Sequence, residues 1–185
     1  MDPQAIPLIH PSAQLGKDVR IGRFSLVDED VVLGDGVVLD DFVVVAKSAV
    51  IGPGTRVGIF TKVGVGARIG AECSFTAYCE IRAGCVIGDR VMMGSRCTLS
   101  AETVIEDDVL VKYGFVATDT PTLSANAVKA TCVLKRGSRF GANVTIMPGV
   151  TVGENSEIGA CSQVRRDVPP NEVWYGCPAT YYRDC

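Results

Sequence analysis

Side chains that could do chemistry are grouped at a few places in this 185-residue sequence. Three carboxylates stand together as Glu106-Asp107-Asp108, and Asp119 follows further on. A carboxylate can accept a proton or orient a reacting group when its surroundings tune it. Two basic pairs, Lys135-Arg136 and Arg165-Arg166, could hold an anionic group. The alternative for each of these charges is an ordinary solvated turn.

Histidine and cysteine, the usual zinc ligands, are not arranged as a metal site. The chain has one histidine, His10, and its eight cysteines form no CxxC pair. Cys73, Cys79 and Cys85 instead follow one another at a spacing of six, with Cys97 twelve residues later. Zinc sites usually draw on closely spaced cysteine and histidine pairs. We therefore expect no metal, and we expect these cysteines to be reduced and buried as small hydrophobic side chains.

That spacing of six belongs to the whole chain. Every sixth residue from Ile9 to Ala117 is apolar, the residue four later is mostly small or β-branched, and the residue one later is often glycine. An α-helix needs apolar spacings of three and four, whereas short strands joined by tight turns fit a period of six. The large and the small residue would point inward, and glycine would tolerate the backbone angles of the turn. Three such strands make one triangular coil of eighteen residues.

The period breaks once. Residues 9–116 make six coils, and the pattern resumes at Leu134 and continues to Val164. Residues about 118–131 are therefore predicted to leave the coils as a loop, which on a rigid scaffold often carries function. A tolerated insertion is the alternative. Two proline residues stop the pattern, so we expect a β-helix over 1–168 and a cap over 169–185 that covers the end of the helix.

Composition excludes several classes of protein. The sequence is 47% hydrophobic and 21% charged, with a net charge of −3, which suits a soluble domain and gives no basic surface for nucleic acid. No apolar run is long enough to span a membrane, and the segment Met1–His10 does not read as a signal peptide. We therefore expect a cytoplasmic protein without a nucleic-acid or membrane partner.

The hexapeptide pattern resembles the bacterial transferase hexapeptide superfamily over nearly the whole chain. The resemblance implies an all-β fold, a left-handed parallel β-helix, which is usually a homotrimer with acyl-CoA bound between neighbouring subunits. Residues 136–153, 164–169 and 173–179 look like the ending of its acyltransferases. We expect aliphatic faces, such as the run Val43-Val44-Val45, to supply the interface between subunits.

Within that superfamily, three segments are similar to the nucleotide-sugar N-acetyltransferases: 105–109, 115–119 and 135–137. These enzymes acetylate an amino group on a UDP- or dTDP-linked amino sugar used in polysaccharide or natural-product biosynthesis. The sequence departs from the pattern at Gly94–Cys97, where members commonly carry asparagines, and at Thr118-Asp119, where Thr-Asn is usual.

The scarcity of histidine bears on the reaction. A hydroxyl acceptor must lose its proton as it attacks, and related enzymes that acylate hydroxyl groups use a histidine base. Here His10 stands at the entry to the first coil, where we interpret it as structural. A neutral amine can attack a thioester when it is merely oriented and its proton is accepted. Glu106 or Asp119 could do this, and they are the candidate catalytic residues.

The remaining assignments follow from the resemblance and from stacking. Gly141-Ala142 and Gly159-Ala160 are eighteen residues apart, so they stack on one face and would let pantetheine amides reach the backbone. The candidates for binding the nucleotide sugar are Arg96, Asp107, Asp108, Thr118, Lys135 and Arg136. The candidates for binding acetyl-CoA are Gly141, Ala142, Asn143, Gly159, Ala160, Arg165 and Arg166.

Two other functions stay open. One is an O-acyltransferase, or another acyltransferase with a different small acceptor. The other is a non-catalytic β-helix subunit that binds partner proteins. A product that carries an ester would favour the first, and a blocked groove between subunits would favour the second.

Overall fold

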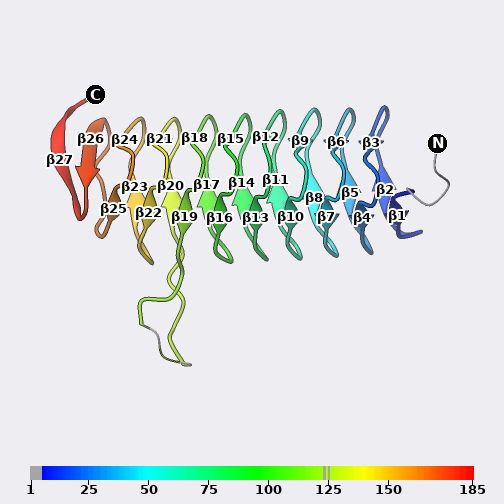
Figure 1. Ribbon diagram of the computed structural model, residues 1–185, viewed down its shortest axis with the longest axis horizontal. Helices are drawn as coiled ribbons and strands as arrows, with labels where there is room; N and C mark the ends of the chain where they lie inside the picture. Colours follow the sequence, from blue (N-terminus) through cyan, green and yellow to red (C-terminus); the bar gives the residue numbers. More distant parts are fainter. Residues whose placement is uncertain (1–5, 123, 125) are drawn as a thin grey trace.

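The computed structural model describes residues 6–122, 124 and 126–185, which form a stack of short parallel strands with no α-helix among them (Figure 1). Residues 1–5 of the N-terminal segment, and 123 and 125 of the predicted loop, lie outside the described residues. Three parallel sheets enclose one core, and the chain passes from sheet A to B to C and returns to A. The predicted all-β solenoid is confirmed, and the arrangement is consistent with a left-handed β-helix.

Each sheet collects every third strand as far as β25, and sheet C also takes in β26 and β27. Sheet A contains β1 (Leu8–Ile9), β4 (Leu26–Val27), β7 (Val44–Val45), β10 (Lys62–Val63), β13 (Glu80–Ile81), β16 (Thr98–Leu99), β19 (Val116–Ala117), β22 (Thr145–Ile146) and β25 (Gln163–Val164). Sheet B contains β2 (Gln14–Leu15), β5 (Val32–Leu33), β8 (Val50–Ile51), β11 (Arg68–Ile69), β14 (Val86–Ile87), β17 (Val104–Ile105), β20 (Val133–Leu134) and β23 (Thr151–Val152). Sheet C contains β3 (Arg20–Ile21), β6 (Val38–Leu39), β9 (Arg56–Val57), β12 (Ser74–Phe75), β15 (Met92–Met93), β18 (Leu110–Val111), β21 (Arg139–Phe140), β24 (Glu157–Ile158), β26 (Glu172–Gly176) and β27 (Ala179–Asp184).

Turns of four residues join the strands at three corners. We call them the A–B corner (for example 82–85), the B–C corner (88–91) and the C–A corner (94–97). Strands pair with the strand eighteen residues away, as Val86 does with Val104. Val104 and Val133 are instead paired across twenty-nine residues, because the loop between β19 and β20 leaves at the A–B corner (Figure 1).

The core is filled as the period predicts. The second residue of the regular strands points inward, and five cysteines, Cys73, Cys79, Cys85, Cys97 and Cys132, are free and buried among the aliphatic side chains. The thiol of Cys79 donates to the carbonyl of Gly94 at 3.2 Å. Burial raises the pKa of the Cys85 thiol to about 11. The four cysteines expected to pack in the core do so, and each of their thiols donates a hydrogen bond to a backbone carbonyl of the next coil.

The glycine expectation is wrong in its physical reason. Glycines that follow the inward aliphatic do not have a positive φ; they lie against the backbone of the next coil. A Cβ on Gly58 would lie 1.3 Å from the carbonyl oxygen of Thr76. The positive φ occurs two residues later in the corner and is mostly occupied by other residues, such as Asp108 and Asn155. Glycine is therefore required by the close spacing of coils rather than by the turn.

The expectation for Val43-Val44-Val45 also needs correction. Val43 and Val45 are fully buried in the core, and only Val44 points outward from sheet A. Three consecutive aliphatic residues do not define an outer face, because successive side chains of a strand alternate between core and solvent.

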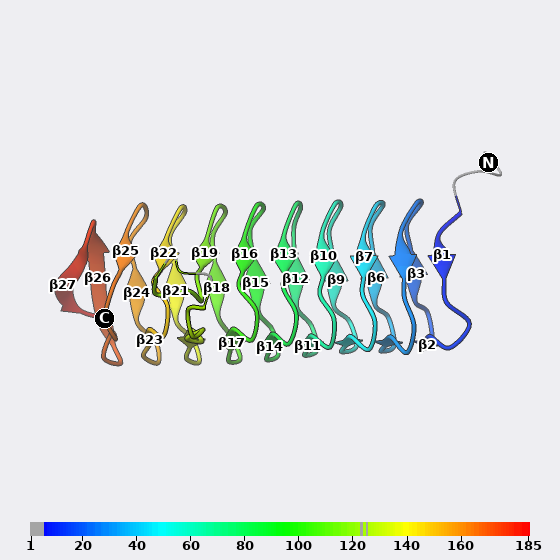
Figure 2. The same ribbon diagram turned by 90° about the horizontal axis from the view of Figure 1, so that it is seen from below.

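The two ends of the solenoid differ, as Figure 2 shows from below. At the C-terminal end β26 pairs with β24, and β27 folds back antiparallel on β26. Trp174 of β26 is 5% exposed and covers the last coil. At the opposite end the inward-facing Ile9 and Leu15 are 37% and 44% exposed. The described segments contain no helix that is long and apolar enough to cross a membrane.

Candidate functional site

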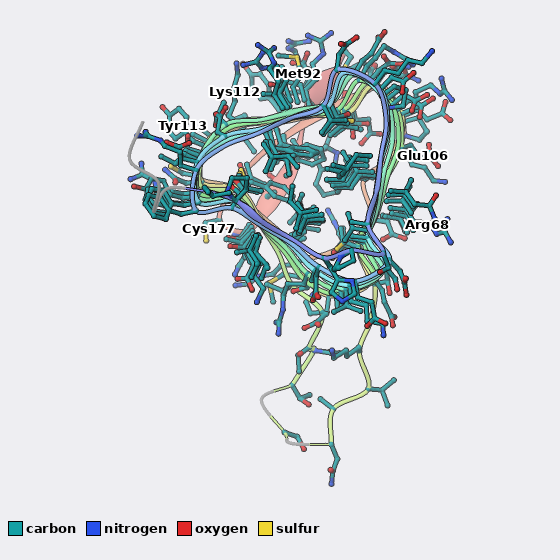
Figure 3. The ribbon with its side chains drawn as sticks, turned by 90° about the vertical axis from the view of Figure 1, so that its right-hand side faces the viewer. Arg68, Met92, Glu106, Lys112, Tyr113 and Cys177 are labelled. Carbon is teal, nitrogen blue, oxygen red and sulfur yellow. The ribbon has the colours of Figure 1, made fainter. Side chains whose placement is uncertain are left out.

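The residues singled out in the sequence lie on three different corners of the triangle. Glu106 to Asp108, Lys135 and Arg136 are at the B–C corner, and Thr118, Asp119 and Arg165-Arg166 are at the A–B corner. Arg96, Gly141 to Asn143, and Gly159-Ala160 are at the C–A corner. Figure 3 looks along the stack and shows Glu106 on the opposite side from Lys112 and Tyr113, with the loop projecting from the remaining corner.

Glu106 is held by two neighbours from the following coil. Its Oε1 accepts a hydrogen bond from Lys135 Nζ at 2.8 Å, and its Oε2 accepts from the backbone N–H of Arg136 at 3.0 Å. The Lys135 ammonium, together with that N–H, lowers the pKa of Glu106 below its usual value. Both oxygens are engaged and the carboxylate is ionised at neutral pH. The carboxylate of Glu106 therefore joins two coils, and this arrangement suits a structural role better than the role of a proton acceptor.

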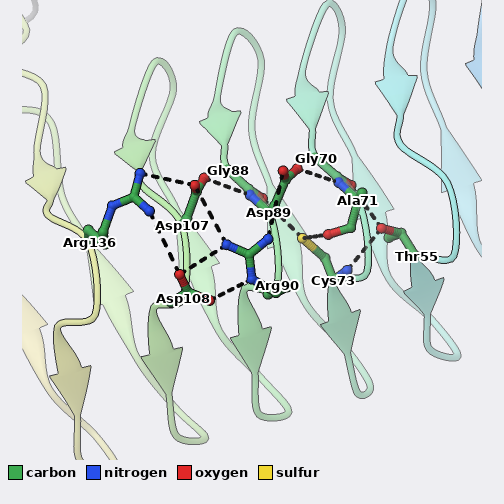
Figure 4. Close-up of polar contacts among 10 residues, drawn as sticks. All are labelled: Thr55, Gly70, Ala71, Cys73, Gly88, Asp89, Arg90, Asp107, Asp108 and Arg136. Atoms are coloured by element: carbon green, nitrogen blue, oxygen red, sulfur yellow. Dashed lines mark hydrogen bonds and ion pairs between the residues drawn. The ribbon is translucent and has the colours of Figure 1, made fainter.

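Asp107 and Asp108 belong to an ionic network that joins successive coils (Figure 4). Asp107 accepts the backbone N–H of Asp89 at 3.0 Å and lies 3.2 Å from the Arg136 guanidinium. Asp108 receives two bonds from Arg90, at 2.7 and 3.0 Å, which lower the pKa of its carboxyl. Both carboxylates are thus bound by groups of this chain. Arg136 connects the network to the coil that follows Asp107.

Asp119 lies at the base of the loop, where its two arms meet. Its side chain is 12% exposed; Oδ1 accepts from the Thr120 hydroxyl at 2.7 Å, and Oδ2 lies 3.6 Å from Lys129 Nζ. Its carbonyl accepts the N–H of Ala130 at 2.7 Å. The Thr120 hydroxyl and then the Lys129 ammonium lower the pKa of Asp119. Among the described residues Oδ2 has this one longer contact, so it retains hydrogen-bonding capacity for a donor that approaches the loop.

The other predicted site residues of the A–B corner are held by contacts with the solenoid. The hydroxyl of Thr118 donates to the carbonyl of Ile146 at 2.8 Å, on the coil after the loop. Arg165 donates to Gln163 at 2.6 Å, and Arg166 stacks 5.0 Å from the ring of Trp174. Arg165 and Arg166 thus lie toward the capped end, on the same corner as the loop.

The two candidate catalytic carboxylates are not brought together within one chain. Glu106 follows β17 of sheet B, and Asp119 follows β19 of sheet A, so the width of sheet B separates them. The histidine is also remote from the loop. His10 is exposed at the A–B corner of the first coil, where its Nδ1 lies 2.9 Å from Ser12 Oγ. Six coils separate it from Thr118, which is roughly 29 Å at the usual spacing of strands.

The small residues at the C–A corner pack tightly. A Cβ on Gly141 would lie 2.5 Å from the backbone nitrogen of Ala160, and one on Gly159 would lie 2.7 Å from Tyr175 Cβ. These glycines therefore meet the requirement of coil spacing described above. Ala142 is half-buried and Asn143 and Ala160 are exposed; we call this surface of the C–A corner the ridge, and an extended ligand could lie on it.

The residues that surround Arg96 were not predicted from the sequence. A hollow of about 570 Å³ is lined by Ala77, Tyr78, Ser95 and Arg96. A second hollow of about 160 Å³ adjoins it on sheet C, between Thr76 and Tyr113, and includes Met92 and Lys112. The signal that could have found them is an aromatic residue at one corner position in four successive coils, at 24, 42, 60 and 78.

Comparison with protein families matches one part of the chain. Residues 131–166 match the bacterial transferase hexapeptide (six repeats) family. In the structure this stretch runs from the end of the loop through β25, and it contains the ridge of Ala142, Asn143 and Ala160.

Curated relatives match over a stretch of similar length. Forty-five residues are 51% identical to the galactoside O-acetyltransferase of Escherichia coli (strain K12), covering 24% of this chain and 22% of that protein. Forty-four residues are 48% identical to a Staphylococcus aureus (strain COL) protein whose name assigns an acetyltransferase and no acceptor, with the same coverage, 24% and 22%. The matches thus span about a fifth of the length of these relatives.

Solved structures extend the likeness to the whole fold. A UDP-N-acetylglucosamine acyltransferase from Bacteroides fragilis aligns with a TM-score of 0.69 and 20% identity, over 98% of this chain and 73% of that one. The Arabidopsis UDP-N-acetylglucosamine acyltransferase aligns with a TM-score of 0.62 and 18% identity, over 100% and 74%. At these identities the likeness establishes the fold.

Proposed function

We propose, from the bacterial transferase hexapeptide repeats of residues 131–166, that this chain is an acetyl-CoA-dependent acyltransferase whose acceptor is the amino group of a nucleotide-linked amino sugar. The family match carries the proposal, because it falls on the coils that contain the ridge of Ala142, Asn143 and Ala160. Two relatives, which are 51% and 48% identical over 45 and 44 residues, are named as acetyltransferases. An acyl-CoA donor follows from that activity.

The reaction needs little covalent chemistry from the protein. The neutral amine attacks the thioester carbonyl, a C–N bond forms, the C–S bond breaks, and the CoA thiolate leaves and takes up a proton. The enzyme contributes mainly by holding the two reactants in line. Asp119 is the better-placed carboxylate to orient the amine, because its Oδ2 has one long contact with Lys129, whereas both oxygens of Glu106 are engaged.

An amine acceptor is favoured by the position of the histidine. Attack by a hydroxyl calls for a base that removes its proton, and the one histidine of the chain lies about six coils from the loop. The acceptor class is supported by the resemblance at 105–109 and 115–119 to nucleotide-sugar N-acetyltransferases. Solved structures with the same fold are named for action on UDP-N-acetylglucosamine.

A homotrimer in the cytoplasm is part of the proposal. Within one chain the donor ridge and the loop lie on different corners, so a site at the contact of two copies would let the loop of one subunit reach the ridge of its neighbour. Sheet B offers a largely aliphatic outer face for such a contact, with Val32, Val50, Val86, Val104 and Val133 pointing outward and Arg68 among them. A light-scattering mass of one chain at micromolar concentration would contradict this assembly.

O-acylation is the second candidate, since the E. coli relative is named as a galactoside O-acetyltransferase. The experiment separates the two. Purified protein is mixed with acetyl-CoA and with UDP- and dTDP-amino sugars or their hydroxyl counterparts, and thiol release is followed. We expect release with the amino sugars and a product that resists neutral hydroxylamine, as an amide does. A hydroxylamine-labile product would favour the ester, and absence of both CoA binding and thiol release would favour a non-catalytic subunit.

A further inference from the structure

Four aromatic side chains form a ladder on the C–A corner. Phe24, Phe42, Phe60 and Tyr78 occupy the same position in successive coils, and their rings stack with centroids 4.9–5.0 Å apart and planes within 14–17°. All four have a positive φ of 57–59°, a conformation that bulky residues rarely adopt. The sequence keeps aromatic residues at this strained position in four coils running.

The ladder ends at Tyr78. The inner rungs Phe42 and Phe60 are 40% and 44% exposed, whereas the terminal rungs Phe24 and Tyr78 are 50% and 59% exposed. An inner ring is covered on both faces, and an end ring on one. Among the described residues no further ring stacks on Tyr78, because the next coil carries Arg96 at the same position, with a φ of 60°.

Cations surround the open end of the ladder. Arg96 lines the hollow beside Tyr78, and Lys112, one coil later, lines the second hollow. In the described part of the chain neither cation forms an ion pair, whereas Arg90 and Arg136 are bound to carboxylates. Hydroxyl groups line the same hollows, Ser95 with Arg96 and Thr76 with Lys112, and Thr76 Oγ1 lies 2.8 Å from Ser95 Oγ.

We propose that this end of the ladder binds a nucleoside diphosphate group, with the base stacked on the open face of Tyr78 as a fifth ring and the diphosphate held by Arg96 and Lys112. A planar ring continues a stack of rings, and a guanidinium and an ammonium complement phosphate oxygens. The hydroxyl groups of Thr76 and Ser95 can meet the ribose. This site adds a place for the nucleotide to the proposed function. Which substrate carries that nucleotide rests on the proposed function.

Two substrates carry this chemistry, namely the nucleotide sugar and CoA. Titration of the wild-type protein by calorimetry with UDP, dTDP, ADP and CoA distinguishes them. Tighter binding of UDP or dTDP assigns the site to the acceptor, and tighter binding of ADP and CoA assigns it to the donor. Failure of all four to bind at millimolar concentration overturns the inference. Thiol release with any amine acceptor would still stand as a separate test of the proposed function.

Variants test the geometry of the site with the nucleotide that binds best. Tyr78→Leu removes the stacking face and is expected to weaken binding about tenfold or more. Tyr78→Phe keeps the face and should bind within about twofold of wild type, because the hydroxyl takes no part in the stack. Arg96→Ala should weaken binding and reduce its dependence on salt, since one phosphate contact is lost.

The matched control is Phe24→Leu, which removes the rung at the other end of the same ladder. It is expected to leave nucleotide binding unchanged, and thermal melting of each variant reports whether the coils remain folded. Equal losses in Phe24→Leu and Tyr78→Leu, or undiminished binding by folded Tyr78→Leu, would overturn the site. An undiminished affinity of Arg96→Ala would overturn the assignment of the diphosphate.

Discussion

Lys135 and Glu106 show how a charged pair can look catalytic in sequence and serve the fold in three dimensions. The two residues are twenty-nine positions apart, yet Nζ and Oε1 lie 2.8 Å apart because the loop has no effect on the stacking of the coils on either side. Asp119 has the opposite character: its backbone closes the loop, and in the described part of the chain one oxygen of its side chain has a single contact, with Lys129 at 3.6 Å. This difference decides which carboxylate is tested as a catalytic group.

Asp119→Asn should lower kcat/KM for the amino sugar about a hundredfold while the KM for acetyl-CoA stays unchanged. The reason is that the amide can no longer accept the proton or attract the amine. Steady-state thiol release measures both quantities. Glu106→Gln is the matched control at the other corner, and a larger loss of kcat/KM in that variant would exchange the roles of the two residues.

Glu106 should also make the fold sensitive to acid. Its pKa is lowered in the folded chain by Lys135, so its contribution to stability is present above the unfolded pKa of about 4.3 and is lost as the pH falls through the lower, folded pKa. Glu106→Gln should therefore lower the urea midpoint at pH 7, and lower it by less at an acid pH below the folded pKa of Glu106. A deficit of the same size at both pH values would show that the pair does not act through its charge.

At the scale of the coil, spacing is enforced by glycine. Gly58 lies against the next coil with no room for a methyl group, whereas nothing lies within 4 Å of a Cβ placed on Gly66, whose φ is +65°. Gly58→Ala is expected to destabilise the fold by about 3 kcal/mol or more, since backbone must move to admit the methyl group. Gly66→Asn should cost less than about 1 kcal/mol, because asparagine tolerates that φ. Urea melts of the two variants give the comparison, and equal losses would contradict the role of coil spacing.

The loop between β19 and β20 is separable from the coils. The segment 118–132 has fifteen residues where a regular corner has four, so an excess of eleven residues leaves the solenoid. Deleting 120–130 leaves a corner of four residues, of which Thr131 is the third. Because the third residue of the regular corners has a positive φ, Thr131→Gly is added, and the variant should form a regular coil. We expect the melting temperature and CoA binding to persist and acylation of the amino sugar to be lost. Retained acylation would remove the loop from the acceptor site.

The fold could be predicted from sequence because its determinant is local and repeated. Each inward aliphatic residue recurs after six positions, so the strands, the three-sided coil and the departure at Thr118 follow from one periodicity. The site could not be predicted to the same extent. The ladder from Phe24 to Tyr78 follows the eighteen-residue coil and could have been found from it, whereas the bond between Glu106 and Lys135 joins positions twenty-nine apart, which the sequence does not relate until the length of the loop is known. The roles of the predicted binding residues stay predictions, since they depend on how neighbouring copies meet.

At the scale of the whole molecule, the ladder, the ionic network and the loop lie at different places along the solenoid axis. The ladder occupies the first four coils, and the ionic network of Asp89, Arg90 and Asp107 lies in the middle coils. The loop and the segment that matches the hexapeptide family lie in the last coils before the cap. Substrates of the proposed reaction would therefore lie along the axis, with their order set by coil number. Extending this surface requires only further coils, and no rearrangement of the core.

The unequal ends, with Ile9 and Leu15 exposed at one and Trp174 covering the other, have a consequence for how the chain unfolds. In a stack where each coil contacts only its neighbours, the stability of a coil is close to a sum of nearest-neighbour terms, so opening proceeds from whichever end has the weaker boundary. We expect amide hydrogen exchange to be fastest in β1–β3 and to slow coil by coil toward β17, with the strands under Trp174 protected. Uniform protection along the axis would mean that all coils open as one unit, and protection that reverses this gradient would make the capped end the weaker boundary.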